Sequence, residues 1–309
     1  MALEVLALRA LGLGDLLTAV PALRALRDTG ARVTVAAPAP LAPLVALAGC
    51  DHQPAEPLQA LPSHTADAEL FVNLHGRGPE SHAIALATHP RRLVAFHHPH
   101  VPATADMPVW DPGEHEVARW CRLLTETGIA ADPARLDLPA PPLPGALAAT
   151  RGATVVHPGA ASPARRWPAA RFATVARAEA RAGRLVVITG GPAETQLARE
   201  VAQRAGLPPE TVLAGRTDLA DLAAVVAHAQ RIVCGDTGVA HLATAFGIPS
   251  VVLFGPTSPH TWGPPRARAR RHRVLWAGRT GDPHAGRPHE GLLEIEPDDV
   301  LAELTALPS

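Results

Sequence analysis

The sequence predicts an α/β protein of two domains, each built on a parallel β-sheet that helices cover. Short apolar segments alternate with helical segments along nearly the whole chain, a pattern typical of parallel sheets that are buried on both faces. A stretch rich in Pro and Ala, residues 136–153, interrupts this alternation near the middle and is the predicted linker. The length of 309 residues is sufficient for two domains that each bury a core.

The first half alternates strands with helices from its beginning. Strands are predicted at 3–10, 31–38, 68–76 and 91–98, and helices at 15–30, 41–49, 81–88 and 114–128. The first and last of these helices end at Gly30 and Gly128, and glycine is the residue most common just after a helix C-terminus. We assign residues 1–145 to this domain.

The second half, residues 146–309, repeats the same alternation. Strands are predicted at 154–160, 184–191, 211–215, 231–235 and 250–255, and helices at 167–182, 193–206, 218–230, 239–247 and 297–305. Two halves made of repeated strand–helix units predict two Rossmann-like domains with parallel sheets facing a cleft.

Composition excludes several classes of protein. The formal net charge is −1, so no overall basic field indicates a nucleic-acid partner. No apolar run approaches the roughly 18 residues of a transmembrane helix, and the apolar N-terminus lacks the basic leader and cleavage site of a signal peptide. The cysteines, Cys50, Cys121 and Cys234, lie far apart without a metal-binding spacing, which favours reduced thiols in a cytoplasmic protein. The chain contains no lysine, so a fixed cation on a ligand must be an arginine or a protonated histidine.

The first strand-to-helix turn has the sequence GLGD over Gly12–Asp15. A dinucleotide-binding fingerprint would need a third glycine at the position of Leu17, so the turn argues against NAD as a cofactor. Asp15 has two interpretations. It could complement the helix dipole as an ordinary N-terminal residue, or it could act as a general base at the carboxyl end of a strand.

The first predicted strand of the second half also ends in polar groups. His157 and Gly159 end that strand, and Arg165 and Arg166 follow in a loop that leads to the next helix. The two arginines could lie in a solvated loop. Alternatively, a guanidinium fork from this loop could bind a phosphate oxygen.

The next strand of this half ends in a double glycine. Gly190 and Gly191 allow another group to approach the backbone closely. Glu194 could accept hydrogen bonds from ribose hydroxyls, or it could simply begin a helix.

The turn at 235–238, with the sequence GDTG, joins a strand to a helix. A helix N-terminus offers free N–H groups and about half a positive charge, which makes it an anion site. Gly238 leaves room for a diphosphate, and Asp236 and Thr237 can cap the turn. His241 lies one helical turn along the same face, so it is either a ligand-facing residue or a core histidine. The loop 255–258, after the following strand, is expected to end beside this turn.

These segments resemble glycosyltransferase family nine, the ADP-heptose heptosyltransferases. The similar segments are LGLGDLLTAVPALRALR, FVNLHGRGPESHAIALATHPRRLVAF, HPGAASPARRWPAARFA and CGDTGVAHLATAFGIPSVVLFGPTSP. The resemblance covers nearly the whole chain. It implies a GT-B fold and an inverting, metal-independent transfer of a sugar, expected to be a heptose, from an ADP-sugar to a hydroxyl group. The ADP-sugar is then a co-substrate, and no cofactor is expected.

The resemblance also implies roles for individual residues. Asp15 matches the family's proposed general base. Arg165 stands where the family has a lysine that binds the donor phosphate, which keeps the charge but changes its shape. The expected donor-binding residues are His157, Gly159, Arg165, Gly190, Gly191, Glu194, Asp236, Thr237, Gly238 and His241. The expected acceptor contacts are Gly14, His75 and Arg77, although the last two could also belong to an ordinary polar loop.

The acceptor and the reaction class leave alternatives open. The acceptor could be the lipopolysaccharide core, another glycan or a secondary metabolite, and a lipid-linked acceptor would imply peripheral contact with a membrane. A nucleotide-sugar epimerase of the same fold would consume the nucleotide sugar without an acceptor. A non-enzymatic sugar-binding protein could share the two-lobed shape, although the missing signal peptide argues against a secreted one.

Overall fold

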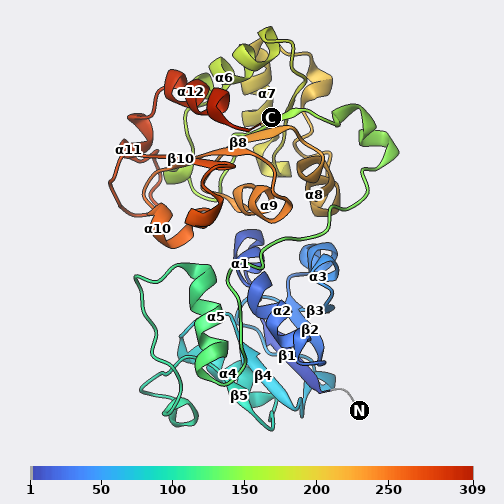
Figure 1. The fold of residues 1–309 in the computed structure, drawn as a ribbon, viewed down its shortest axis with the longest axis vertical. Helices are drawn as coiled ribbons and strands as arrows, with labels where there is room; N and C mark the ends of the chain where they lie inside the picture. Colours follow the sequence, from blue (N-terminus) through green and yellow to red (C-terminus); the bar gives the residue numbers. More distant parts are fainter. Residues whose placement is uncertain (1–2, 309) are drawn as a thin grey trace. The chain divides into compact units, whose positions relative to one another are not determined.

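The structure is a computed structural model that describes residues 3–308 and divides the chain into two units, Met1–Leu138 and Pro139–Ser309 (Figure 1). The division lies inside the predicted linker, residues 136–153. Within the described residues each unit holds one five-stranded sheet. None of the helices in this part of the chain is long and apolar enough to cross a membrane.

Unit 1 is built on parallel strands in the order β3-β2-β1-β4-β5. The strands are β1 (Glu4–Leu8), β2 (Arg32–Ala37), β3 (Asp51–Pro54), β4 (Leu70–Asn73) and β5 (Leu93–Val94). The helices are α1 (Leu13–Thr18), α2 (Val20–Asp28), α3 (Ala42–Leu47), α4 (Pro79–Ala87) and α5 (Glu116–Glu126). All four residues of β4 are buried, which explains why its sequence begins with a run of apolar residues rather than an alternation of apolar and polar ones.

Unit 2 has parallel strands in the order β10-β9-β8-β6-β7. The strands are β6 (Thr154–His157), β7 (Val186–Ile188), β8 (Arg231–Gly235), β9 (Ser250–Phe254) and β10 (His272–Trp276). The helices are α6 (Ala169–Arg181), α7 (Thr195–Ala205), α8 (Leu219–Ala227), α9 (Gly238–Phe246), α10 (Pro259–Trp262), α11 (Glu290–Leu293) and α12 (Pro297–Ala306). Trp167 and Phe172 pack edge to face in the core of this unit, with ring centroids 5.0 Å apart.

The structure corrects two of the predicted elements. The single helix predicted at 15–30 is divided into α1 and α2 at Ala19, because Pro21 stands in the first turn of α2, where its missing N–H is tolerated. The strand predicted at 211–215 is a 3₁₀ turn, Pro209–Thr211, followed by one isolated bridge between Val212 and Ile188.

Two strands were missed by the sequence analysis, β3 and β10. Both are edge strands, and their sequences, DHQP and HRVLW, lack the continuous apolar run of the central strands. An edge strand needs fewer apolar residues because one side of it pairs with no other strand.

The strand orders identify where each unit is expected to bind a ligand. In each sheet, successive strands of the chain are added first toward one edge and then toward the other. This reversal falls between β1 and β4 in unit 1 and between β6 and β8 in unit 2. Open α/β sheets bind ligands outside the carboxyl ends of the strands at such a switch point. The relevant segments are therefore those that leave β1 and β4 in unit 1, and those that leave β6 and β8 in unit 2.

Candidate functional site

His157 is the last residue of β6, and its side chain joins the ends of two neighbouring strands. Its Nδ1 atom hydrogen-bonds Thr189 Oγ1, just after β7, at 2.9 Å. Its Nε2 atom lies 4.0 Å from Glu194 Oε2. Burial lowers the pKa of His157, and the Glu194 carboxylate opposes that shift only in part. His157 is therefore a neutral imidazole near pH 7 that holds this end of the sheet together.

Glu194 lies across the glycines that follow β6 and β7. Its Oε2 atom accepts a hydrogen bond from the Gly191 N–H at 2.7 Å. A Cβ atom on Gly159 would overlap the Glu194 carboxylate, and one on Gly190 would lie 3.1 Å from Glu194 Cβ. The glycines thus allow the carboxylate to lie beside His157. The structure brings together all five residues that the sequence analysis selected here.

The turn after β8 presents the start of α9. Asp236 follows β8, and its N–H donates to the Leu253 carbonyl at 3.0 Å. Thr237 is the N-cap of α9, but its side chain makes no capping hydrogen bond. The first N–H groups of a helix have no partner inside the helix, so this end attracts an anion. His241 lies in the next turn, where its ring packs edge-on against Trp262 with centroids 6.1 Å apart.

Arg165 lies beside this turn. Its Nη1 atom is 3.7 Å from Asp236 Oδ2, and the Asp236 side chain is only 7% exposed. The Nε atom of Arg165 is buried and has no hydrogen-bond partner among the described residues. Gly235 permits this approach, because a Cβ there would lie 3.0 Å from the Arg165 carbonyl oxygen. Arg166 has a different role: its Nε donates to the Ala160 carbonyl at 2.9 Å and shapes the loop.

The loop that carries Arg165 is held by a distant segment of the same unit. The Ala164 N–H donates to the Ala285 carbonyl at 3.1 Å, and the Trp167 indole donates to the Ile295 carbonyl at 3.0 Å. The loop 255–258 also contacts it, since a Cβ on Gly255 would lie 3.3 Å from the Ala164 carbonyl. The position of Arg165 therefore depends on residues far away in the sequence.

Asp15 in unit 1 caps its own helix and keeps a partly exposed carboxylate. Its Oδ2 atom accepts a hydrogen bond from the Gly12 N–H at 3.2 Å, which caps α1. Its Oδ1 atom lies 3.4 Å from Arg9 Nη2. The carboxylate is 29% exposed, so it is also accessible from solvent. Gly14 lies in the same first turn of α1.

The acceptor candidates His75 and Arg77 follow β4, the neighbour of β1. The His75 N–H donates to Asn73 Oδ1 at 3.0 Å, while His75 Nδ1 is buried without a hydrogen-bond partner in residues 3–308. Burial and then Arg9 lower the pKa of His75, and Asp15 opposes them. His75 thus lies within electrostatic reach of Asp15. Arg77 is exposed.

The sequence analysis missed Arg9 and Glu116. Arg9 Nη2 donates to Glu116 Oε1 at 3.0 Å in the interior of unit 1, next to Asp15. Arg9 did leave a signal in the sequence, because it is a charged residue inside the apolar stretch LALRALGLG. Glu116 left none, because it has the ordinary appearance of an acid in the first turn of α5.

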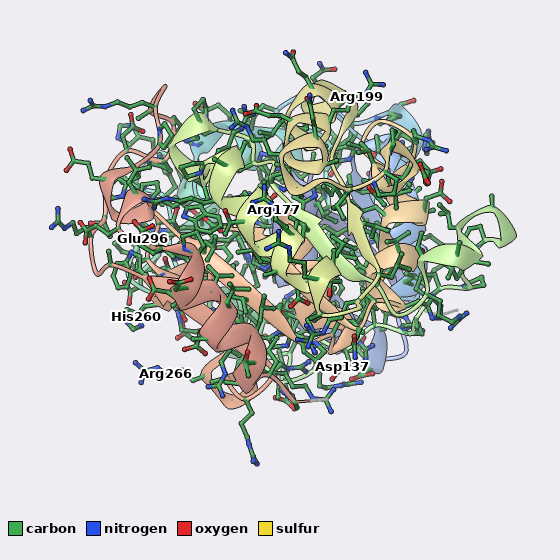
Figure 2. All side chains as sticks on the ribbon, turned by 90° about the horizontal axis from the view of Figure 1, so that it is seen from above. Asp137, Arg177, Arg199, His260, Arg266 and Glu296 are labelled. Carbon is green, nitrogen blue, oxygen red and sulfur yellow. The ribbon has the colours of Figure 1, made fainter. Side chains whose placement is uncertain are left out.

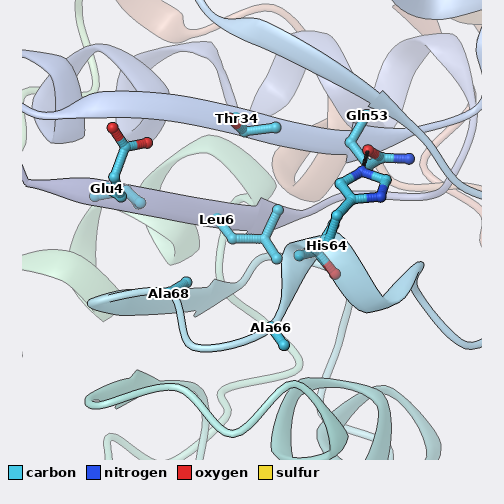
Figure 3. Close-up of a pocket in the computed structure, with 9 residues that line it drawn as sticks. Glu4, Leu6, Thr34, Gln53, His64, Ala66 and Ala68 are labelled. Atoms are coloured by element: carbon cyan, nitrogen blue, oxygen red, sulfur yellow. Dashed lines mark hydrogen bonds between the residues drawn. The ribbon is translucent and has the colours of Figure 1, made fainter.

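One cavity and one open groove lie away from these strand ends. A cavity of about 250 Å³ on unit 1 lies over the early part of β1, where Gln53 and His64 are joined by a hydrogen bond of 2.7 Å (Figure 3). An open groove on unit 2 lies between α6 and α7, beside Arg177 (Figure 2). Neither holds a residue selected from the sequence. Among the described residues, no three His, Cys, Asp or Glu side chains are grouped as a metal site would need.

Comparison with known proteins identifies one family. The model of glycosyltransferase family 9 (heptosyltransferase) matches residues 105–285. Lipopolysaccharide heptosyltransferase 2 of Escherichia coli is 34% identical over 157 residues, which are 48% of this chain and 45% of that protein. The chain thus spans about half the length of the curated relative it matches.

Similar solved structures cover the whole fold. The E. coli ADP-heptose lipopolysaccharide heptosyltransferase II has a TM-score of 0.77 and 23% identity over 98% of both chains. The E. coli heptosyltransferase WaaC with ADP-2-deoxy-2-fluoro heptose has a TM-score of 0.72 and 17% identity, over 98% of this chain and 99% of that one. These likenesses concern the fold alone, and they confirm the predicted α/β class and GT-B fold.

Proposed function

The chain belongs to glycosyltransferase family 9, and on that premise we propose that it transfers a heptose from an ADP-heptose donor to a hydroxyl group of an acceptor glycan. The transfer inverts the anomeric carbon and uses no catalytic metal. The matched relative is a lipopolysaccharide heptosyltransferase, so a lipopolysaccharide-core glycan is the first acceptor to test. An acceptor carried on a lipid would bring the protein into peripheral contact with a membrane.

One observation supports binding of the donor most strongly: a partly exposed arginine with an unpartnered nitrogen lies beside the turn that begins a helix. Arg165 Nε is buried without a partner in the described structure, and Nη1 is 3.7 Å from Asp236, next to the first turn of α9. A guanidinium and free helix N–H groups together suit a diphosphate. Both would stabilise the negative charge that grows on the leaving diphosphate.

The acceptor half rests on Asp15. In the proposed step the acceptor oxygen attacks the anomeric carbon, and its proton passes to the Asp15 carboxylate. The bond from the anomeric carbon to the phosphate oxygen breaks, and ADP leaves with the electron pair. The carboxylate at the switch point of unit 1 is available for this role because its side chain is partly exposed, although the Gly12 N–H contacts Oδ2 and Arg9 lies 3.4 Å from Oδ1.

Titration of the protein with ADP, UDP and GDP in a calorimeter tests the donor assignment. We expect ADP to bind most tightly, because the family resemblance points to an ADP-sugar. Tight binding of UDP or GDP with no binding of ADP would refute this assignment.

Turnover of ADP-heptose with candidate acceptors tests the reaction and its base. In the Asp15→Asn variant the side chain still caps the helix but cannot take a proton. We expect kcat to fall about 10²–10⁴-fold, with donor affinity and melting temperature close to the wild type. A wild-type kcat would leave Asp15 as a capping residue only. Conversion of the donor to an epimer without any acceptor would instead favour an epimerase.

A further inference from the structure

Arg9 follows β1 and is almost completely buried, with a side chain that is 1% exposed. Its Nε atom donates to the Asp15 carbonyl at 2.9 Å, and Nη1 donates to the Leu74 carbonyl just after β4. Its Nη2 atom lies within 3.4 Å of Asp15 Oδ1 and 3.2 Å of Thr18 Oγ1. One guanidinium therefore contacts both segments that leave the switch point of unit 1.

Glu116, at the start of α5, supplies a counter-charge to Arg9. Its Oε1 atom accepts hydrogen bonds from Arg9 Nη2 and from the Trp120 indole, both at 3.0 Å. Its Oε2 atom pairs with Arg119. The Arg9 guanidinium also lies over the Trp120 ring, 4.6 Å from its centroid. The side chain of Glu116 is 5% exposed, so this ion pair is buried.

The arrangement orients the Asp15 carboxylate from two sides. The Gly12 N–H holds Oδ2 and Arg9 holds Oδ1, while the Arg9 Nε contact also fixes the Asp15 main chain. The linked charged residues are two arginines and two acids, Arg9, Arg119, Asp15 and Glu116, so their formal charges sum to zero. Glu116 therefore shares the positive charge of Arg9, which leaves Asp15 with a contact of only 3.4 Å rather than a close ion pair.

We propose that Arg9 is a positioning residue that orients the Asp15 carboxylate for proton transfer, and that Glu116 holds Arg9 in place for this role. The inference rests on the proposed function of Asp15 as the base. Lysine cannot replace this arginine fully, because a single ammonium group cannot reach the acceptors that the planar guanidinium fork reaches together.

The test compares Arg9→Lys with Arg122→Lys, the same substitution at another arginine, as a control. Arg122 also pairs with a glutamate, Glu114, and also lies over a ring, that of Phe96, but no contact links it to Asp15. A displacement of about 1 Å at a catalytic group can cost about 100-fold in rate. We expect Arg9→Lys to lose about that much kcat with an unchanged KM for the donor, and Arg122→Lys to keep the wild-type kcat.

The decisive measurement places Arg9→Lys in the Asp15→Asn background. If Arg9 acts through the carboxylate, the double variant has the same kcat as Asp15→Asn alone, because effects that share one group are not additive. A general structural role would instead multiply the two losses, and that outcome would overturn the inference. If Asp15→Asn alone keeps the wild-type kcat, the base assignment fails and not merely the role of Arg9.

A second variant guards against a failure to fold. Glu116→Gln keeps the shape of the side chain and removes its charge, so urea unfolding can show whether the core is retained. We expect kcat to fall in this variant and again to show no further fall in the Asp15→Asn background. A folded Glu116→Gln protein with wild-type kcat would contradict the role of Glu116.

Discussion

At the scale of single residues, Arg165 is the proposed counterpart of the family's phosphate-binding lysine. The family resemblance expects a lysine that binds the donor phosphate, and the chain contains none. Gly235 lets the main chain of Arg165 approach β8, and Asp236 Oδ2 lies 3.7 Å from Arg165 Nη1. An arginine can give two parallel hydrogen bonds to a phosphate, whereas a lysine acts as a point charge.

Arg165→Ala should weaken ADP binding, because a hydrogen bond to a charged group contributes about 1.5–3 kcal/mol, or roughly 10- to 150-fold. Arg165→Lys should recover part of that loss. Calorimetric titration measures both, with Arg204→Ala as the control, because Arg204 is exposed and paired with Glu200 on α7. If the loss follows Arg166→Ala instead, Arg166 is the donor residue.

Gly159 and Glu194 form a second testable pair. A side chain on Gly159 must displace the Glu194 carboxylate, which then loses the Gly191 N–H. If Glu194 binds the donor, Gly159→Ala and Glu194→Ala should each weaken ADP binding. The double variant should bind ADP as tightly as the single variant with the lower affinity, because both changes act through the same carboxylate. Unchanged ADP binding with reduced thermal stability would show that Glu194 only begins its helix.

At the scale of elements, the arginine-rich segment before β10 is explained by a helix end. Arg268 donates to the Thr244 carbonyl and Arg271 to the Gly247 carbonyl, each at 3.0 Å. Both carbonyls lie at the C-terminus of α9, where cations are stabilising. The segment leads into β10, whose first residue is the buried His272.

His272 should make unit 2 sensitive to acid. Burial, with Arg268 and Arg271, lowers the pKa of His272 to about 4, below its ordinary value of 6.5. Its contribution to stability is therefore complete above pH 6.5 and is lost as the pH falls toward 4. The shift corresponds to about 3 kcal/mol in total, of which about 2 kcal/mol is lost at pH 5.

Urea unfolding at pH 7 and pH 5 measures this loss. The wild type should lose about 2 kcal/mol more stability between these pH values than His272→Gln, in which residue 272 cannot gain a proton. His260→Gln provides the control, because His260 is exposed. Equal losses in the wild type and His272→Gln would show that His272 does not titrate in this way.

At the scale of the whole molecule, the two units have separate sheets and separate buried clusters. Every residue expected to bind the donor lies in Pro139–Ser309, and every residue expected to contact the acceptor lies in Met1–Leu138. Units with their own cores can in principle fold alone. Donor binding should therefore be a property of unit 2.

Residues 139–309, produced alone, should fold cooperatively and bind ADP within about threefold of the full chain, a difference below about 0.7 kcal/mol. Calorimetry and urea unfolding check both points. Arg165→Ala in this segment should weaken binding as it does in the full chain. A folded segment that fails to bind ADP would show that unit 1 contributes donor contacts.

The sequence by itself determined what is encoded within a few consecutive residues. The apolar runs of β1, β8 and β9 predict buried strands. Gly30 and Gly128 predict helix ends, and the structure gives both a left-handed φ. The turn at 235–238 predicts an anion site at the start of α9. The alternation of strands with helices also predicts two parallel sheets, because a helix between two strands brings the chain back to start the next strand in the same direction.

Only the tertiary structure decided which distant residues meet. Arg9 and Glu116 are 107 positions apart and pair because α5, which carries Glu116, packs against α2 in unit 1. Local sequence pattern does not separate Arg165 from Arg166, and the packing of the loop brings the first to Asp236 and the second to the Ala160 carbonyl. The edge strands β3 and β10 are identified only by their pairing with β2 and β9, respectively. Local sequence patterns predict helices, strands and turns. They do not predict which buried charged residues form an ion pair, because that pairing depends on how all the elements of a unit pack together.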